Sequence, residues 1–173
     1  FPVDMAAARN AGQKLARRED QMIFYGVKAF GLEGLLTAKG VGTQPLGDWN
    51  SGEEAFVAVV QAMSSLSAKG KLGRYALIRT HDLYISLHRL QSGTGVMEID
   101  RIKNMLSGGI FNATVLEPKT ALLVCAQPLY LDLMVGQDIS VAYTELVDLN
   151  HHLRILETAL VRIKYPEAIV VFK

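Results

Sequence analysis

Apolar residues recur at helical spacing at the start of the chain. From Asp4 to Tyr25 they fall mostly three, four or seven positions apart, which is the spacing of one face of an α-helix. Asp4 can accept hydrogen bonds from the first free backbone N–H groups, and Gly26 can end the helix. The pattern therefore predicts a long amphipathic helix with an apolar face of Met5, Ala8, Ala11, Leu15, Met22 and Ile23.

The next segment, residues 26–50, is rich in glycine and predicts a connection with several tight turns. Ser51 and Glu54 then have the spacing of a capping box, in which each side chain bonds a backbone N–H of the other's turn. A second helix is predicted from there to Gly70, with an apolar face of Phe56, Val59, Val60, Met63 and Leu66.

The middle of the chain alternates between strand and helix signals. Residues 75–80 (YALIRT) predict a short buried strand, and Asp82 is placed to cap a helix after it. Residues 91–97 (QSGTGVM) have no periodicity and predict a loop, and Gly108 and Gly109 end a further helix. The apolar positions of these two helices are Leu83, Leu87, Leu90, Ile99, Ile102 and Leu106.

The last third of the chain is rich in strand signals. Residues 110–116, 120–126 and 129–135 are apolar runs separated by proline-containing turns, which predicts a meander of consecutive strands. Residues 153–164 fit either a helix or a strand, and periodicity alone leaves both open. Residues 167–172 (EAIVVF) read as a closing strand.

Composition places the chain among folded globular proteins. Half of the 173 residues are hydrophobic and 20% are charged, enough for the core of one domain. The net charge of +1 gives no reason to expect nucleic acid or a membrane surface as a partner, and no apolar run is long enough to span a bilayer. Because the first residue is Phe and no signal peptide is recognisable, we expect the natural start to lie upstream.

The residues that carry chemistry in other proteins form no recognisable catalytic or cofactor motif here. The sequence has neither a P-loop nor a nucleophile motif that would use His88, and the adjacent His151 and His152 point apart on a strand or a helix. Cys125 lies within an apolar run and reads as a buried, inert thiol. We therefore predict no catalytic residue, no metal site and no cofactor.

Two further residues invite a functional reading but have simpler explanations. Asp138, in the stretch VGQDISVAY, has no nearby acidic partner in the sequence, so a structural role is favoured over that of a general base. Trp49 lies in the glycine-rich connection, where a lone aromatic ring more often anchors the segment to the body than binds a ligand.

Several segments, taken in order, resemble the encapsulins. The clearest is GQDISVAY (136–143), and others are AARNAGQKLARREDQMIFYG (7–26), GRYALIRTHDLY (73–84) and PEAIVVFK (166–173). In the third of these, Arg74 stands where the family commonly has proline. The chain is identified by this resemblance as encapsulin-like, and also as similar to linocin.

The resemblance implies an α+β fold, that of the tailed-phage major capsid proteins, with a spine helix, a peripheral domain and an axial domain. The expected division is residues 1–26 for the spine helix of the peripheral domain, 27–141 for the linker and axial domain, and 142–173 for the closing strands of the peripheral domain. It also predicts that residues 153–165 are a strand. The inward-facing helix and extended loop that usually come first in the family are not found in this sequence.

The resemblance also implies a function and two sites. The expected function is a non-enzymatic subunit that assembles with copies of itself into an icosahedral cytoplasmic shell. Cargo such as a ferritin-like protein or a dye-decolourising peroxidase would bind through a C-terminal targeting peptide. The expected cargo-binding residues are Asp138, Ile139, Val141 and Tyr143, and the expected pore loop is Ser92, Gly93, Thr94, Gly95 and Val96.

Two alternatives stay open at this point. A viral or prophage capsid protein would share the fold, and only the neighbouring genes would separate it from a nanocompartment shell. A hydrolase is a weaker alternative, because linocin-like relatives have attracted bacteriocin or peptidase labels. Asp138, His81 and Cys125 are the residues to mutate if a turnover is measured.

Overall fold

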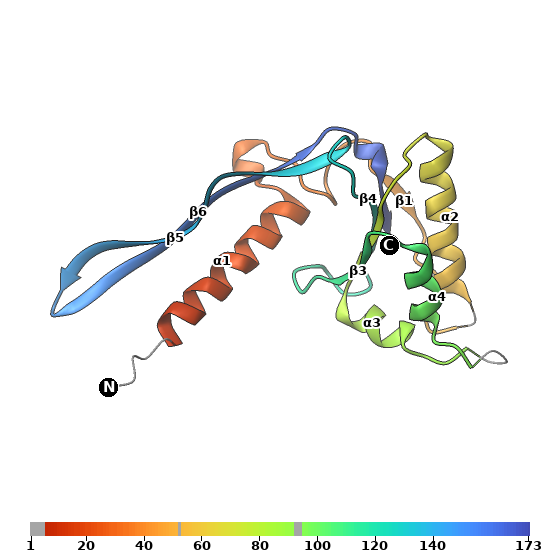
Figure 1. The fold of residues 1–173 in the computed structure, drawn as a ribbon, viewed down its shortest axis with the longest axis horizontal. Helices are drawn as coiled ribbons and strands as arrows, with labels where there is room; N and C mark the ends of the chain where they lie inside the picture. Colours follow the sequence, from red (N-terminus) through yellow and green to blue (C-terminus); the bar gives the residue numbers. More distant parts are fainter. Residues whose placement is uncertain (1–5, 52, 92–94) are drawn as a thin grey trace.

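The computed structural model describes residues 6–51, 53–91 and 95–173, which form a body and a long arm (Figure 1). The arm consists of helix α1 (Ala6–Tyr25) and a two-stranded ribbon of β5 (Leu131–Val147) and β6 (Asn150–Ile163). The other elements form the body. They are η1 (Lys28–Phe30), β1 (Gly42–Gln44), α2 (Glu54–Ala68), β2 (Tyr75–Arg79), α3 (His81–Leu87), α4 (Glu98–Met105), β3 (Gly109–Asn112), β4 (Ala121–Cys125), η2 (Pro166–Ala168) and β7 (Ile169–Phe172).

The body is built on a mixed five-stranded sheet in the order β1-β7-β4-β2-β3. Strands β1 and β7 are parallel, as are β2 and β3, while β4 is antiparallel to both β2 and β7. The predicted meander is therefore wrong. Strand β3 pairs with β2 rather than with β4, and β5 leaves the sheet to form the ribbon. Local patterns find strands but do not show which strands pair.

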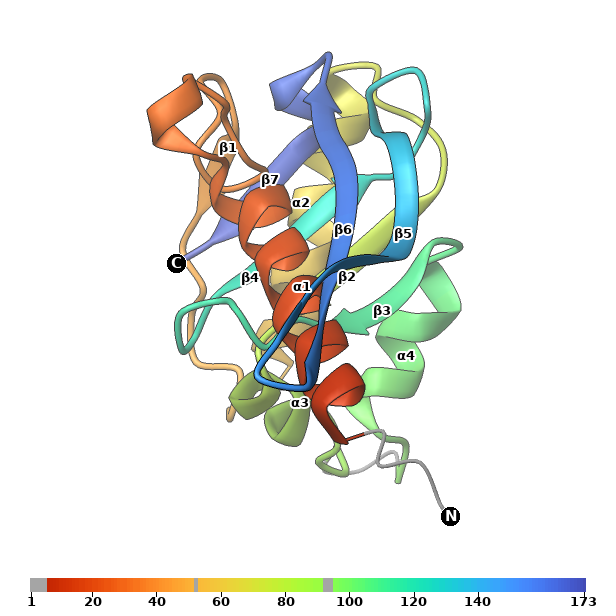
Figure 2. The same cartoon turned by 90° about the vertical axis from the view of Figure 1, so that its left-hand side faces the viewer.

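Core side chains pack on both faces of this sheet. One cluster joins the sheet to α2, α3 and α4, with Leu77, Leu123 and Phe172 fully buried. The other joins the opposite face to the end of α1, through Phe24 and Val171. The sheet is thus the middle layer of the body, and the arm begins from its second face (Figure 2).

Trp49 anchors the glycine-rich connection, as expected. Its side chain is 1% exposed and its ring lies edge-on to Phe172, with 5.7 Å between the ring centroids. The connection also contributes strand β1, which has only three residues and which the sequence analysis missed.

The predicted helices form, but their ends and faces differ in part. Helix α1 ends at Tyr25 as predicted, whereas the proposed cap, Asp4, lies outside the described residues. The capping box of α2 is wrong, because Glu53 is its N-cap residue and the Glu54 carboxylate instead accepts the Asp48 backbone N–H at 2.6 Å. The buried face of α2 is also rotated from the prediction. It consists of Ala55, Ala58, Val59, Ala62 and Leu66.

The ribbon settles the ambiguous segment, since residues 153–163 belong to β6. Its two strands are joined by a turn in which Asp148 and Leu149 both have positive φ angles. Strand β5 passes through residue 141, where the predicted axial and peripheral domains meet, and β7 lies in the body sheet. The division into these two domains stays a prediction.

Close backbone contact locks the end of α1 to the segment that follows it. The Leu35 and Leu36 N–H groups donate to the Ile23 and Phe24 carbonyls, each at 2.9 Å. A Cβ atom added to Gly34 would lie 2.4 Å from the Gly26 backbone nitrogen, so no larger residue fits there without moving the backbone. The direction in which the helix leaves the body depends on this contact.

We expect Gly34→Ala to lower the free energy of unfolding by about 1–3 kcal/mol, because the new methyl group overpacks a backbone contact. Gly12→Ala is the matched control in the same arm, since an added Cβ there meets nothing within 4 Å. That control should raise the free energy of unfolding by about 0.5–1 kcal/mol through helix propensity. Chemical denaturation of both variants measures the two effects, and equal stabilities would contradict the argument.

Candidate functional site

The two faces of the ribbon differ in polarity. Residues directly opposite each other on antiparallel strands share a face. Val161 and Ile163 pack against the end of α1, so they and their partners Leu133 and Leu131 lie on the face toward the helix. The opposite face carries mainly polar residues, among them Arg162 with its partner Asp132.

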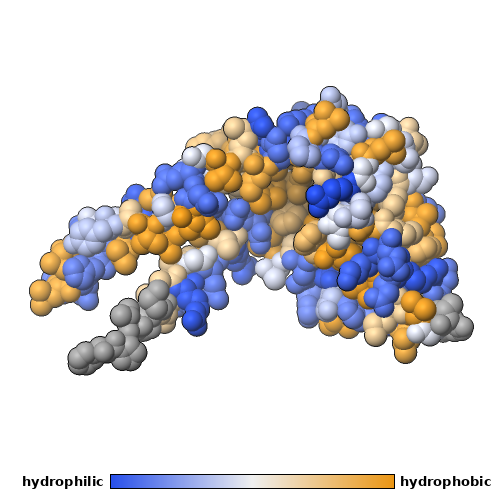
Figure 3. Space-filling model, viewed as in Figure 1, coloured by the Kyte–Doolittle hydropathy of each residue, from blue (hydrophilic) through white to orange (hydrophobic). Residues whose placement is uncertain are grey.

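Helix α1 covers only part of the apolar face. Its C-terminal end packs beside β6, while β5 lies farther from it (Figure 2) and the ribbon extends farther from the body than the helix does (Figure 1). Six large apolar side chains of this face are each 42–63% exposed. They form what we call the ribbon strip: Leu133, Val135, Val141, Tyr143, Leu146 and Leu153. Apolar surface follows the underside of the arm in Figure 3.

Three bulges in β5 interrupt the pairing of the ribbon, between Val135 and Gln137, Gln137 and Ser140, and Tyr143 and Glu145. Each one adds a residue to β5 alone. A single added residue reverses which face the following side chains occupy. The last bulge therefore brings Leu146 to the same face as Tyr143, even though the two residues are three apart.

The polar pair that interrupts the apolar stretch, Gln137 and Asp138, occupies the bulged segment. The Gln137 side chain donates to the Ser140 hydroxyl at 2.8 Å, and the Asp138 carboxylate accepts the Ile139 backbone N–H at 2.7 Å. The second of these bonds satisfies a backbone N–H group in the segment where the pairing is interrupted. The structure thus gives Asp138 a local structural role.

The four expected cargo-binding residues lie close together on β5, and all are exposed. Val141 and Tyr143 belong to the ribbon strip, and Ile139, 57% exposed, lies in the bulged segment beside them. The other members of the strip were not predicted from the sequence as site residues. Alternation of apolar residues in 131–135 was a usable signal, but the bulges hide its continuation toward the tip.

The expected pore loop falls between α3 and α4 in the chain, and only Gly95 and Val96 of its residues belong to the described part of the structure. Ser92, Gly93 and Thr94 lie outside the described residues. At the ends of the loop, the Gln91 N–H donates to the Val96 carbonyl at 3.0 Å and the Gly95 N–H donates to the Gln91 carbonyl at 3.3 Å.

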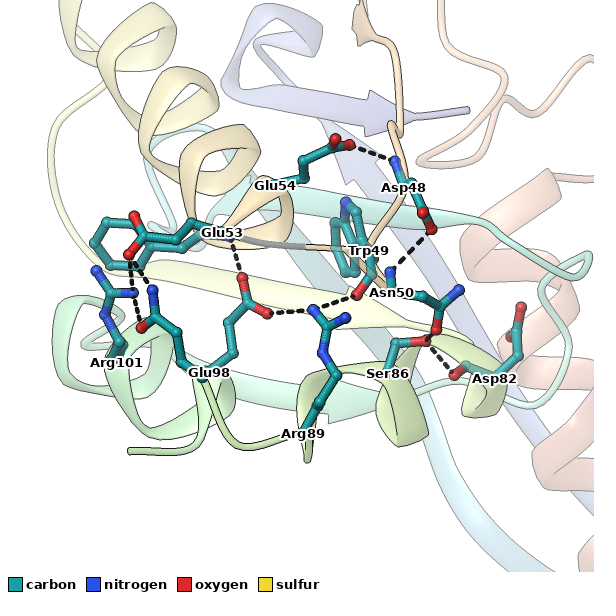
Figure 4. A network of polar contacts seen from close by, with 12 residues as sticks. Asp48, Trp49, Asn50, Glu53, Glu54, Asp82, Ser86, Arg89, Glu98 and Arg101 are labelled. Atoms are coloured by element: carbon teal, nitrogen blue, oxygen red, sulfur yellow. Dashed lines mark hydrogen bonds and ion pairs between the residues drawn. The ribbon is translucent and has the colours of Figure 1, made fainter. Parts of the chain in front are cut away.

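A polar network holds both ends of this loop to helix α2 (Figure 4). The Glu98 carboxylate is 2% exposed; it accepts the Phe56 backbone N–H at 3.1 Å and lies 3.4 Å from the Arg89 guanidinium. Glu98 thereby performs, from another helix, the capping role that the sequence analysis gave to Ser51. Arg101 pairs with Glu53 at 3.0 Å, and the Gln91 side chain bonds both of these residues.

Two acidic residues of the arm have pKa values shifted in opposite directions. Hydrogen bonds from Arg162 and Lys164, each 2.7 Å long, lower the pKa of Asp132 far below its usual range. Partial burial between α1 and the ribbon, followed by the nearby Glu157 and Asp20 carboxylates, raises the pKa of Glu19.

The candidate catalytic residues do not converge. Asp138 lies in the arm, whereas His81 begins α3 and Cys125 ends β4 in the body (Figure 1). Cys125 is buried, and burial raises the pKa of its thiol. Within the described ranges no three His, Cys, Asp or Glu residues group as a metal site would require, and none of the helices has the length and apolarity to cross a bilayer.

Comparison with known proteins identifies the family. A family model described as the encapsulating protein for peroxidase matches residues 1–160. The type 1 encapsulin shell protein EncA of Myxococcus xanthus is 40% identical over 98% of this chain. The chain belongs to the encapsulin family. A diheme-cytochrome-encapsulin shell fusion protein of Kuenenia stuttgartiensis is 38% identical over 97% of the chain. The chain spans 59% and 46% of the lengths of these two encapsulins.

Solved structures share the architecture of this encapsulin chain. A virus-like particle from Pyrococcus furiosus matches with a TM-score of 0.86 and 25% identity, over 98% of this chain and 68% of that one. The capsid of Myoviridae phage XM1 matches with a TM-score of 0.73 at 10% identity, over 98% of this chain and 65% of the phage chain, which shows a shared fold. The predicted α+β fold of the tailed-phage capsid proteins is confirmed.

The pKa values of Asp132 and Glu19 are shifted in opposite directions, so we expect opposite effects on the unfolding temperature when each side chain is replaced by its neutral amide. Asp132 has a lowered pKa, so its ion pairs stabilise the fold above the unfolded value of about 4 and are lost as the pH falls through the folded value. Asp132→Asn should therefore lower the unfolding temperature at pH 7. Glu19 has a raised pKa, so its charge opposes folding at pH 7 and Glu19→Gln should raise that temperature.

The Glu19→Gln difference should vanish as the pH falls to about 4, where the folded wild-type carboxyl group is protonated. The Asp132→Asn difference should begin to shrink below about 4, where the unfolded chain takes up the proton first, and should persist in part at about pH 3 because the folded carboxyl group is still charged there. Thermal unfolding followed by circular dichroism from pH 3 to pH 7 measures them. Shifts of the same sign for both variants at pH 7 would contradict the assignment.

Proposed function

We propose that this chain provides the wall-forming part of an encapsulin shell subunit. In this proposal, copies of the full-length protein assemble into an icosahedral cytoplasmic particle that encloses cargo, and no residue of the chain catalyses a reaction. The observation that carries the proposal is 40% identity to an encapsulin shell protein over 98% of the chain. The likeness to a virus-like particle at a TM-score of 0.86 supports it.

The shape of the chain supports a role in assembly. An arm with an uncovered apolar face is unsuited to a free subunit, because large exposed apolar patches mark interaction sites. The part of the ribbon strip nearer the tip has this character, with Leu146 at 52% exposed and Leu153 at 62%. Stable obligate assemblies bury on the order of 2,000 Å² or more per interface, and a projecting arm supplies such area to neighbours.

The β5 side of the ribbon strip is also our proposed docking site for cargo. Val141 and Tyr143 offer apolar contacts, and Ile139 and Asp138 lie beside them. The bound segment would be a C-terminal targeting peptide of a cargo protein such as a ferritin-like protein or a dye-decolourising peroxidase. Encapsulin relatives fused to a diheme cytochrome and to a ferritin-like protein support this reading, because they join a shell to another protein in one chain.

We further propose that residues 92–96 line a small polar pore where axial domains meet. The network around Glu98 supports this role, because it fixes both ends of the loop to α2 and α4.

A viral or prophage capsid protein is the second candidate, favoured by the fold that the chain shares with the phage XM1 capsid. That likeness, at 10% identity, speaks for the fold alone, while family membership favours the nanocompartment. The separation of Asp138 from His81 and Cys125 speaks against a hydrolase that would use them together.

We expect the purified full-length protein to form hollow particles of uniform diameter in electron micrographs. The physical reason is that apolar faces left open in one copy are covered by others. Monomers alone at micromolar concentration would overturn the proposed shell. Particles that contain nucleic acid and none of the proposed cargo would favour the capsid alternative.

Changing the strip should remove cargo while leaving the shell in place. We expect Val141→Glu with Tyr143→Glu to reduce at least tenfold the loading of a fluorescent protein carrying the targeting peptide of a ferritin-like cargo, because apolar contacts are replaced by charge. Arg154→Glu on the opposite face of the ribbon is the control and should load normally. Equal loading of intact particles by both variants would exclude the strip as the docking site.

A further inference from the structure

The chain passes between body and arm at three places, residues 26–41, 126–130 and 164–168. The last two form the joint from which the ribbon leaves the sheet. They are tied together through Tyr130, whose carbonyl accepts the N–H groups of both Lys164 and Tyr165, at 2.8 and 3.1 Å. The Tyr130 hydroxyl reaches the body and donates to the Gly70 carbonyl at 3.2 Å.

A buried lysine of the body lies inside this joint. Lys71 follows helix α2 and is 9% exposed. Its ammonium nitrogen lies 4.0 Å from the ring centroid of Tyr165 and 5.2 Å from that of Tyr130, and these two rings meet edge-on. It also pairs with the Glu167 carboxylate at 3.3 Å. A single cation from the body thus contacts both segments that connect the ribbon to it.

The electrostatics of the joint fit a charged lysine. The pKa of Glu167 is lowered, first by a hydrogen bond from its own backbone N–H and further by Lys71. The faces of the tyrosine rings carry partial negative charge, and a desolvated ammonium over such a face binds more strongly than an exposed one.

A second charged contact fixes the first residues of the ribbon. Asp132 of β5 accepts two hydrogen bonds from Arg162 of β6, and Lys164 bonds both Asp132 and the Pro128 carbonyl at 2.7 Å. This contact holds the two strands to each other. Its members belong to the two strands and the segments next to them, whereas Lys71, just after α2, contacts both connecting segments from the body.

We propose that Lys71 is a positioning residue that fixes the angle between arm and body, and that this angle sets the curvature of the wall that the copies build. The second half rests on the proposed function. Repeated heterologous contacts close into a shell only when each copy presents its surfaces at one constant angle. A loosened joint would give each copy a range of angles and the particles a range of diameters.

The test compares Lys71→Met with Lys69→Met in the full-length protein. Methionine has a similar length and keeps the packing on the rings while the charge is lost. Lys69 is exposed and lies two residues away, so its variant controls for loss of a positive charge on the same turn. In Lys71→Met we expect the Lys164 and Tyr165 amides to exchange with solvent roughly tenfold faster than in the control.

Electron micrographs of the same samples should show several diameters for Lys71→Met and one diameter for Lys69→Met. Glu167→Gln, which keeps the ring contacts, should give a smaller change in exchange. Fluorescence of Trp49, the single tryptophan, buried in the body, verifies that each variant is folded.

Each result decides a separate part of the proposal. Exchange rates in Lys71→Met within about twofold of the control would show that Lys71 does not hold the joint, whether or not particles form. Faster exchange with a single unchanged diameter would overturn the link to curvature. If the wild-type chain forms no particles, the shell function and the curvature claim both fail, and the exchange rates still decide whether Lys71 holds the arm.

Discussion

The apolar face of the ribbon is wider than the one helix that packs on it, and the rest of the structure depends on this mismatch. A two-stranded ribbon is marginally stable by itself in water, so β5 and β6 need α1 against them. Helix α1 covers the part of β6 next to the body and leaves the ribbon strip exposed. The arm therefore presents apolar surface that the described residues leave uncovered, and large exposed apolar patches mark interaction sites.

Several details of the sequence serve this face and its direction. The bulges in β5 keep apolar side chains on one side over a strand of 17 residues, although their spacing in the sequence is irregular. At one of these bulges, the Asp138 carboxylate accepts the Ile139 backbone N–H, and the Gln137 side chain donates to the Ser140 hydroxyl. Close contact at Gly34 fixes where α1 leaves the body, and the cluster around Lys71 ties the ribbon to α2. These features act on geometry, and none of them needs a reactive group.

Local sequence patterns predicted where helices and strands form better than they predicted which strands pair and which residues cap the helices. Helix α1 follows from the helical spacing of its apolar residues, although only Phe24 is buried, and strand β2 follows from a short, mostly apolar run that is buried on both faces. The pairing of β3 with β2 depends on a crossover through α3 and α4, which no local pattern shows. Glu98 caps α2 from 42 residues away, so a short-range motif at Ser51 and Glu54 gave the wrong cap. Periodicity left both helix and strand open for residues 153–164, because one face of that strand is partly covered and the other is solvated. The family resemblance then favoured the strand.

The proposed cargo site and the proposed contacts between neighbouring copies are built from one apolar surface of the arm. Apolar area that is open in the free chain binds whatever covers it, and a neighbouring copy and a peptide both gain by removing it from water. Cargo binding and contact with neighbouring copies are compatible if they use different parts of the face that α1 packs on. The peptide would bind the β5 side of that face, and the neighbouring copies would cover its tip. A rigid joint between arm and body therefore matters for both kinds of contact. If the angle of the arm varied, neighbouring copies would bind it with varying geometry. A peptide that bound it would also cost a greater loss of conformational entropy.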